Sequence, residues 1–221
     1  MPRIGRIVVQ GYPHHITQRG NYRQTVFVEK PDYQKYLELL ELYAVKNNLL
    51  LLAYCLMPNH VHYIAVPQND NSLAKTFNAC HMRYSQYFNK KKRSFGHLWQ
   101  GRFYSCVLDE PHLYAAIRYI ENNPVRARLT RTAENWDWSS ARYHISGERS
   151  IVTLANIDKH LYISNWKDYL MQIDDPTIIG KIKANTLTGR PLGSNVFVTK
   201  IERIFNIRLT PLTRGRPRKE H

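Results

Sequence analysis

Two apolar segments separated by only two residues constrain the fold of this chain more than any other feature. Residues 49–57 form an uninterrupted apolar run, and residues 60–66 form a second, mostly apolar one. Each run has the length of a buried strand, and the Pro58-Asn59 pair between them is a turn signal. A connection of two residues joins antiparallel strands, because a parallel pair needs a long crossover. The sequence therefore predicts a hairpin within one sheet.

Patterns before and after the hairpin give the chain a β-α-β-β-α-β order, followed by a further helix. Alternation marks the strands, and apolar residues at spacings of three and four mark the helices. Strands are predicted at residues 14–19, 49–57, 60–66 and 103–108, and helices at residues 32–47, 72–88 and 109–123. This order is typical of the ferredoxin-like arrangement, an antiparallel sheet with helices on one face. The predicted fold class is therefore α+β.

Capping residues and prolines set the predicted helix ends. Asp32, Ser72 and Asp109 each stand where an N-cap is needed. Pro124 disfavours helical geometry in the residue before it, so the third helix is expected to end at Asn123. The basic run at residues 90–93 is predicted as a loop. Residues 25–28 either extend the sheet or lead into the first helix.

The second strand of the hairpin carries two histidines that could share a metal ion. Strand residues two apart point to the same side, so His60 and His62 present their imidazoles together. Two half-exposed histidines without a metal are the alternative for a bare His-x-His pattern. The spacing alone does not choose between these interpretations.

The third predicted helix brings a phenol and an amide to one side. Its apolar stripe is formed by Leu113, Ala116, Ile117 and Ile120. Tyr119 lies about 110° from the centre of that stripe and flanks the core. Asn123, four residues later, lies on the same side as Tyr119. A boundary tyrosine and a helix-end asparagine are the alternative interpretation.

Together these residues suggest a reaction on a phosphodiester. With a pKa of about 10, a tyrosine is protonated at neutral pH and is a weak nucleophile. It can attack a phosphodiester where a metal polarises the phosphate. His60, His62 and the Asn123 carbonyl would form a three-ligand site for Mg²⁺ or Mn²⁺. The expected product is a 5′-phosphotyrosine and a free 3′-OH, which conserves the bond energy for rejoining another strand end.

The charge balance indicates a polyanionic partner. The chain has 32 Lys and Arg against 17 Asp and Glu, a net charge of +15. Such a surplus favours nucleic acid first and an anionic membrane surface second. No window approaches about 18 consecutive apolar residues, and the first six residues lack the apolar stretch of a signal peptide. The three cysteines form no Cys-x-x-Cys pair, which is typical of a reducing cytoplasm.

More than half of the surplus charge lies in the last fifth of the chain. Residues 181–221 carry ten Lys and Arg against two acids. We therefore expect a catalytic domain at residues 1–150 and a basic DNA-binding extension at residues 151–221, with a helix after Ser194. Near the end, residues 213–219 are similar to an AT-hook, an arm that lies in a narrow minor groove. A solvated basic tail is the alternative.

Five segments in order resemble one protein family. They are His15-Ile16-Thr17-Gln18-Arg19-Gly20-Asn21, Tyr54-Cys55-Leu56-Met57-Pro58-Asn59-His60-Val61-His62, His97-Leu98-Trp99-Gln100-Gly101-Arg102-Phe103, Tyr119-Ile120-Glu121-Asn122-Asn123-Pro124-Val125-Arg126-Ala127 and Trp138-Ser139-Ser140. These segments are similar to the single-tyrosine HUH transposases, and above all to REP-associated tyrosine transposases. The resemblance covers about residues 2–145.

The resemblance implies a metal-dependent endonuclease and strand transferase for single-stranded DNA. By analogy, His60 and His62 are metal ligands and Tyr119 is the nucleophile. Asn123 matches the position of the third ligand, where some relatives carry glutamine. The implied substrate is a short palindromic hairpin, such as a bacterial repetitive extragenic palindrome. A nucleoid-associated bacterial protein is expected, and monomer and homodimer both remain open.

Further basic and aromatic residues are predicted to contact DNA. They are Arg19, Trp99, Arg102, Arg126, Arg128, Arg190, Arg214 and Arg216. Trp99 is equally suited to stacking on a base and to anchoring the core. Two rival functions also stay open: a ferredoxin-like nucleic-acid binder without catalysis, and a metal-dependent nuclease in which water is the nucleophile.

Overall fold

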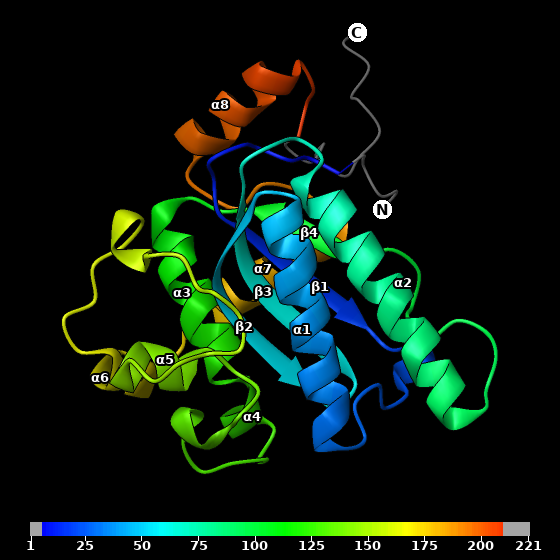
Figure 1. The fold of residues 1–221 in the computed structure, drawn as a ribbon. Coiled ribbons are helices and arrows are strands. Elements are labelled where there is room, and N and C mark those ends of the chain that lie inside the picture. Colours follow the sequence, from blue (N-terminus) through cyan, green and yellow to red (C-terminus); the bar gives the residue numbers. More distant parts are fainter. Residues whose placement is uncertain (1–5, 210–221) are drawn as a thin grey trace, which may run out of the picture.

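A computed structural model describes residues 6–209 of the 221-residue chain (Figure 1). Four antiparallel strands form one sheet in the order β2-β3-β1-β4. The strands are β1 (His14–Arg19), β2 (Leu49–Met57), β3 (His60–Pro67) and β4 (Tyr104–Val107). The first strand therefore lies inside the sheet, between β3 and β4. This confirms the predicted hairpin and the ferredoxin-like α+β fold.

Helices cover both faces of the sheet. They are α1 (Lys30–Lys46), α2 (Ser72–Lys92), α3 (Glu110–Glu121), α4 (Asn123–Arg126), α5 (Ala141–Ser146), α6 (Trp166–Met171), α7 (Pro176–Thr188) and α8 (Asn195–Phe205). The two helices inside the βαββαβ unit, α1 and α2, lie together on one face, as predicted (Figure 1). The opposite face packs against α3 and α7. None of the helices among residues 6–209 has both the length and the apolar character needed to cross a bilayer.

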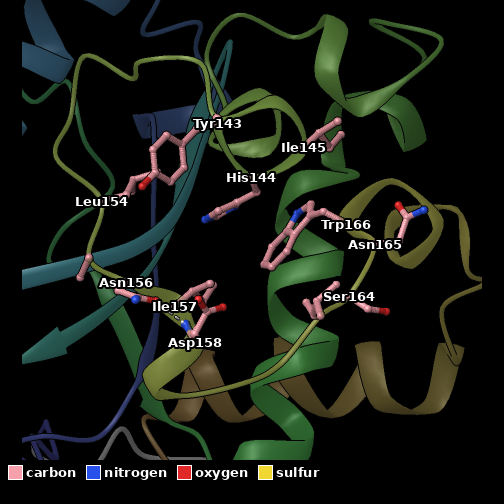
Figure 2. A pocket seen from close by; sticks show the side chains of 13 residues that line it. Tyr143, His144, Ile145, Leu154, Asn156, Ile157, Asp158, Ser164, Asn165 and Trp166 are labelled. Carbon is pink, nitrogen blue, oxygen red and sulfur yellow. Dashed lines mark hydrogen bonds between the residues drawn. The ribbon is translucent and has the colours of Figure 1, made fainter.

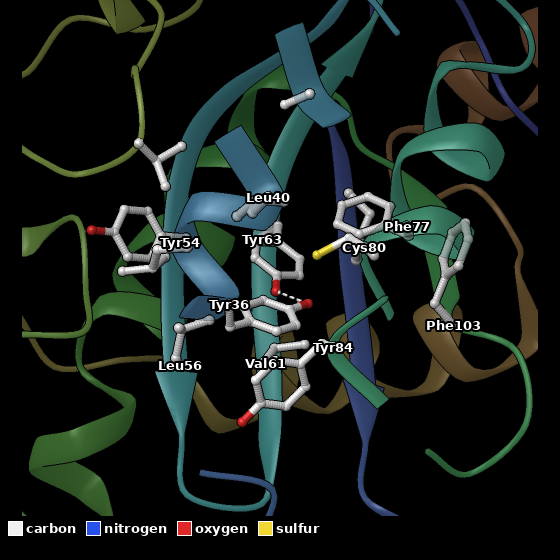
Figure 3. Packing of buried hydrophobic residues seen from close by; sticks show 14 of the residues in the cluster. Tyr36, Leu40, Tyr54, Leu56, Val61, Tyr63, Phe77, Cys80, Tyr84 and Phe103 are labelled. Atoms are coloured by element: carbon white, nitrogen blue, oxygen red, sulfur yellow. Dashed lines mark hydrogen bonds between the residues drawn. The ribbon is translucent and has the colours of Figure 1, made fainter. Parts of the chain in front are cut away.

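The core under α1 and α2 is rich in tyrosine. Alternate residues of β3, including Val61 and Tyr63, point toward these helices, because successive strand residues face opposite sides. Tyr63 donates a hydrogen bond of 2.5 Å to the Tyr36 hydroxyl at the centre of this core (Figure 3). Tyr84 donates to the Val26 carbonyl. Each buried phenol thus retains a polar partner, which removes the cost of an unpaired hydroxyl.

The core on the other face includes the C-terminal part of the chain. Leu52 and Ile64 from the sheet and Ile117 from α3 belong to one buried cluster with Ile182 and Leu192. Ile182 lies on α7, within the predicted extension. The described part of that extension is therefore packed onto the sheet. The alternate residues of β3, His60 and His62 among them, face this second core.

Four helix ends differ from the predictions. The N-cap of α2 is Asn71, and Ser72, predicted as the cap, is the first residue of the helix. Glu29, and not Asp32, is the N-cap of α1; Asp32 stands three residues later and completes a capping box. The predicted loop at residues 90–93 is wrong for its first three residues, because α2 continues to Lys92. Lys91 anchors this last turn by ion pairs with Asp32 and Glu29 at 2.6 and 3.2 Å.

The end of α3 also differs from the prediction. The helix stops at Glu121, and the short helix α4 begins at Asn123. Pro124 occupies the first turn of α4, where a missing N–H is tolerated. Residues 25–28 are not a strand; the backbone N–H groups of Val26 and Phe27 donate to the Pro58 carbonyl instead.

Candidate active site

The two histidines of β3 lie side by side on the face that packs against α3 and α7. Their ring centroids are 5.1 Å apart. The Asn59 amide donates through Nδ2 to the Arg23 carbonyl, so its Oδ1 is the atom that lies 2.6 Å from His60 Nδ1. An amide oxygen only accepts, which assigns the His60 proton to Nδ1. The Nε2 lone pair of His60 is then available to a metal ion.

His62 has a partner of a different kind. Its Nδ1 lies 3.0 Å from Nε2 of His15, on the neighbouring strand β1. The planes of the two rings are nearly parallel, at 9°, and their centroids are 5.2 Å apart. His15 in turn lies 2.7 Å from the Thr186 hydroxyl on α7. Both His15 and Thr186 are almost completely buried. Neither residue was predicted as a site residue, although His15 begins the first of the family-like segments.

The predicted nucleophile and third ligand meet these histidines from α3 and α4. The ring of Tyr119 stands edge-on to His62 at a centroid distance of 5.7 Å. The Asn123 amide nitrogen lies 3.4 Å from His60 Nε2. Residues from two separate parts of the chain therefore converge on one point. The arrangement agrees with the predicted site, whose individual roles remain proposals.

Burial sets the protonation states at this point. It lowers the pKa of His60 to about 4, with a further contribution from Arg19, and holds the pKa of His62 well below its usual value. Burial also raises the pKa of the Tyr119 phenol, and Arg126 opposes that effect. At neutral pH both imidazoles are thus neutral, which is the form that ligates metals, and the phenol is protonated.

The donor set fits a divalent cation. Among residues 6–209, no three His, Cys, Asp or Glu side chains are grouped to hold an ion. A third ligand from this site must therefore be of another type, and the Asn123 amide lies within 3.4 Å of His60. The Asn123 oxygen accepts a hydrogen bond from Arg126 in this structure, so ligation would require the amide to rotate and give up that bond. Two imidazoles and one amide oxygen form a ligand set that suits Mn²⁺ and tolerates Mg²⁺.

A cavity of 310 Å³ opens over these residues and carries positive charge. His60, His62 and Tyr119 line it, together with Arg19 from β1 and Lys183 from α7. The Lys183 ammonium lies 5.5 Å from the centroid of the Tyr119 ring. Two cations beside a phenol and a metal-ligand pair make this cavity suited to a phosphate group.

Lys183 and Thr186 were missed because α7 was not predicted. The sequence does contain the signals for this helix: Asp175 and Pro176 at its start and Gly189 just after its end. These signals locate a helix, but they do not say that it packs against β1 and α3. That packing is what brings its side chains to the histidines.

Arg126, predicted as a DNA contact, lies closer to the site than expected. Its guanidinium donates to the Tyr119 carbonyl, to Asn123 Oδ1 at 3.3 Å and to Asp174 at 3.3 Å. It also lies over the Tyr119 ring, 4.4 Å from the centroid. Arg126 thus contacts both Tyr119 and Asn123 across the break between α3 and α4.

The other predicted DNA contacts have varied environments. Trp99 is only 7% exposed and packs among Phe27, Tyr36 and His81, so most of its ring anchors the core. It also lines a cavity of 550 Å³ together with Arg102. Arg102 and Arg128 are exposed, outside the catalytic cavity, and Arg190 is half-buried. Arg214 and Arg216 lie outside the described residues.

A larger cavity, of 760 Å³, shares no lining residue with the catalytic one (Figure 2). Its wall includes His144 and Trp166, which point inward from α5 and α6. Both side chains donate to the buried carboxylate of Glu121, as does Ser140. Glu121 therefore ties α3 to the segment that follows it, and the polar groups here stabilise the fold.

Replacing Glu121 by alanine is expected to lower the free energy of unfolding by about 3–5 kcal/mol, because three donors would lose one buried acceptor. Urea denaturation followed by circular dichroism measures this loss. Glu148→Ala, at an exposed position of the same region, serves as the control and should change little. Equal stability of the two variants would show that the network contributes nothing.

Comparison with known proteins was informative for family and for fold. The family model of IS200-like transposases matches residues 8–123. One similar solved structure is a REP-associated tyrosine transposase bound to a REP hairpin; it is 18% identical, with a TM-score of 0.53, and the match covers 74% of this chain and 96% of that one. Another, a proposed transposase of Deinococcus radiodurans R1, is 26% identical, with a TM-score of 0.38, over 55% of this chain and 97% of that one. No curated protein matches the chain.

Proposed function

The chain belongs to the IS200-like transposase family, and we therefore propose that it cleaves single-stranded DNA and rejoins the ends through a covalent phosphotyrosine. Membership of this family makes the chain a DNA-processing enzyme. The observation that supports the specific reaction is the convergence of His60, His62 and Tyr119 on one positively charged cavity, with the Asn123 amide 3.4 Å from His60. Attack by the Tyr119 oxygen on a phosphate polarised by a metal ion would give each of the four side chains a role.

In the cleavage step, Tyr119, the two neighbouring cations and the proposed metal ligands have separate roles. The Tyr119 oxygen attacks the scissile phosphorus, the bond from phosphorus to the 3′ oxygen breaks, and the phosphoryl group stays on the tyrosine. The phenolic proton is lost, and the leaving 3′ oxygen gains one. Arg126 and Lys183, which flank the ring, favour the negative charge that develops on the phenol. A divalent ion held by His60, His62 and Asn123 would polarise the phosphate.

The second step is the reverse of the first. A 3′-OH from another strand end attacks the phosphotyrosine, the bond from phosphorus to the tyrosine oxygen breaks, and the phenol recovers its proton. The phosphotyrosine therefore joins DNA without an added energy source. The two buried histidines are neutral, so they can bind a metal ion throughout both steps without first losing a proton.

We propose hairpin DNA as the substrate class. The solved REP-associated transposase with the same fold is bound to a REP hairpin. This chain carries a net charge of +15, which suits a folded strand with closely spaced phosphates. Arg19 on the cavity rim and the exposed Arg102 and Arg128 are the described arginines that we propose to contact its backbone.

The proposal is tested with hairpin DNA labelled at one end and incubated with the full chain and Mn²⁺. On a denaturing gel, 3′-labelled DNA should migrate as a protein adduct, because the tyrosine retains the 5′-phosphate of that fragment. DNA labelled at its 5′ end should instead give a shorter free fragment with a 3′-OH. Cleavage without an adduct would indicate that water is the nucleophile. Binding without cleavage would indicate a non-catalytic protein.

Removing the Lys183 charge is expected to slow adduct formation about 10-fold, equivalent to about 1.4 kcal/mol in the barrier. The Lys183→Ala variant loses a cation that lies 5.5 Å from the Tyr119 ring. Single-turnover rates of adduct formation measure the effect. Lys181→Ala is the matched control, because Lys181 is exposed on the same helix and does not line the cavity. Equal rates of adduct formation in the two variants would show that Lys183 has no role in the reaction.

A further inference from the structure

A buried line of hydrogen bonds connects helix α7 to the second metal-ligand candidate. The Thr186 hydroxyl donates to the Ile182 carbonyl at 2.7 Å. The same oxygen lies 2.7 Å from His15 Nδ1, and His15 Nε2 lies 3.0 Å from His62 Nδ1. Thr186 and His15 are each 1% exposed, so water does not replace these bonds. The line thus runs from a helix carbonyl to the cavity.

The direction of each hydrogen bond in this line follows from its first member. A carbonyl oxygen only accepts, so the single hydroxyl proton of Thr186 is committed to Ile182. With the hydroxyl proton of Thr186 directed at Ile182, the Thr186 oxygen accepts from His15 Nδ1–H. A second lone pair of that oxygen is free to accept from the Cys106 thiol, whose sulfur lies 3.2 Å away. Both lone pairs of the oxygen are therefore used.

The same reasoning gives the proton positions on the imidazoles of His15 and His62. His15 is buried without an anionic partner, which favours its neutral form. A neutral imidazole with its proton on Nδ1 has a lone pair on Nε2. That lone pair must accept from His62 Nδ1–H. The other ring nitrogen of His62, Nε2, then carries no proton and has a free lone pair.

We propose that Thr186 and His15 are positioning residues that fix the tautomer of His62, so that its Nε2 lone pair is always available to a metal ion. This inference rests on the proposed function of His62 as a ligand. Without the Thr186 oxygen, His15 could carry its proton on Nε2 and donate it toward His62. His62 would then hold its own proton on the nitrogen that faces the ion.

The two ligand histidines are thus oriented by different parts of the chain. The Nδ1–H of His60 donates to the Oδ1 of Asn59, the adjacent residue in the hairpin turn. His62 depends on Thr186, which lies on α7 and outside the segment matched by the transposase family model. Outer partners of this kind affect metal affinity by roughly 10- to 100-fold. The C-terminal part of this chain therefore acts on the metal site as well as on DNA.

The tautomer itself provides the first test, and it needs neither metal nor DNA. In the full chain with ¹⁵N-labelled histidine, nuclear magnetic resonance should show His62 protonated on Nδ1 alone. Thr186→Val, which keeps the shape and removes the hydroxyl, should shift part of that proton to Nε2. Thr186→Ser should restore the original signal. An unchanged signal in Thr186→Val would overturn the proposal, whether or not the protein cleaves DNA.

Metal affinity provides the second test. Titration of the full chain with Mn²⁺, followed by electron paramagnetic resonance of the free ion, should show binding weakened roughly 10- to 100-fold in Thr186→Val and restored in Thr186→Ser. Thr188→Val is the matched control, because the Thr188 hydroxyl bonds only to its own helix. Failure of serine to restore binding would assign Thr186 a packing role. Absence of Mn²⁺ binding and of a DNA adduct in the wild type would instead contradict the proposed function.

Discussion

Replacing Tyr119 by phenylalanine should abolish the protein–DNA adduct and reduce cleavage by roughly 10⁴-fold or more, as expected for the loss of a nucleophile. The substitution removes one oxygen and retains the ring. The edge-on contact between the Tyr119 ring and His62 does not depend on that oxygen. Folding and metal binding should therefore remain close to those of the wild type.

A second tyrosine of the same cavity provides the control for this experiment. Tyr104 lines the cavity from β4, and Tyr104→Phe should still form the adduct. Denaturing gels of 3′-labelled hairpin DNA, followed by mass spectrometry of the modified peptide, distinguish the two variants. An adduct that persists in Tyr119→Phe, or a modified peptide that lacks Tyr119, would identify another nucleophile.

Replacing His60 and His62 together by alanine should eliminate cleavage and spare most of the DNA affinity. The two imidazoles supply two of the three proposed ligands, so the double variant should lose the catalytic ion. Affinity for DNA comes mainly from lysine and arginine contacts with phosphates, which the substitutions leave in place. We expect a loss of at least about 10³-fold in the cleavage rate and only a few-fold change in binding.

Two assays separate these effects. Fluorescence anisotropy with labelled hairpin DNA measures binding, and denaturing gels measure cleavage with and without a chelator. His97→Ala, at an exposed histidine outside the catalytic cavity, is the matched control and should retain both activities. Cleavage that survives the double substitution or the chelator would contradict a metal held by this pair.

Local patterns were sufficient to predict which candidate residues lie near one another in the sequence-adjacent parts of the site, even though Tyr119 and Asn123 belong to two helices and not to one. Strand alternation placed His60 and His62 on one side, and helical spacing placed Tyr119 beside Asn123. Both relations depend on neighbours within four residues, which periodicity describes well. The ferredoxin-like order was predictable for the same reason, since each strand and helix has its own signal and the hairpin fixes one strand pairing.

Contacts between distant residues were not predictable in this way. His15 and Thr186 are 171 positions apart, and nothing in either segment indicates the other. Trp99 shows a related limit: a tryptophan near arginines suits both a DNA surface and a core, and only packing against Phe27 and Tyr36 decides. The basic run at residues 90–92 suggested a loop because the acidic partners of Lys91 are distant in sequence.

The contact between β1 and α7 has a consequence for the order in which the enzyme is made. A ribosome synthesises the chain from its N-terminus, and N-terminal parts fold first. A nascent chain that ends at residue 150 already contains the histidine pair of β3, Tyr119 and Asn123, but it has no Thr186. If Thr186 fixes the tautomer of His62 as proposed, that tautomer is fixed only after helix α7 has been synthesised. DNA cleavage would then begin with the finished protein.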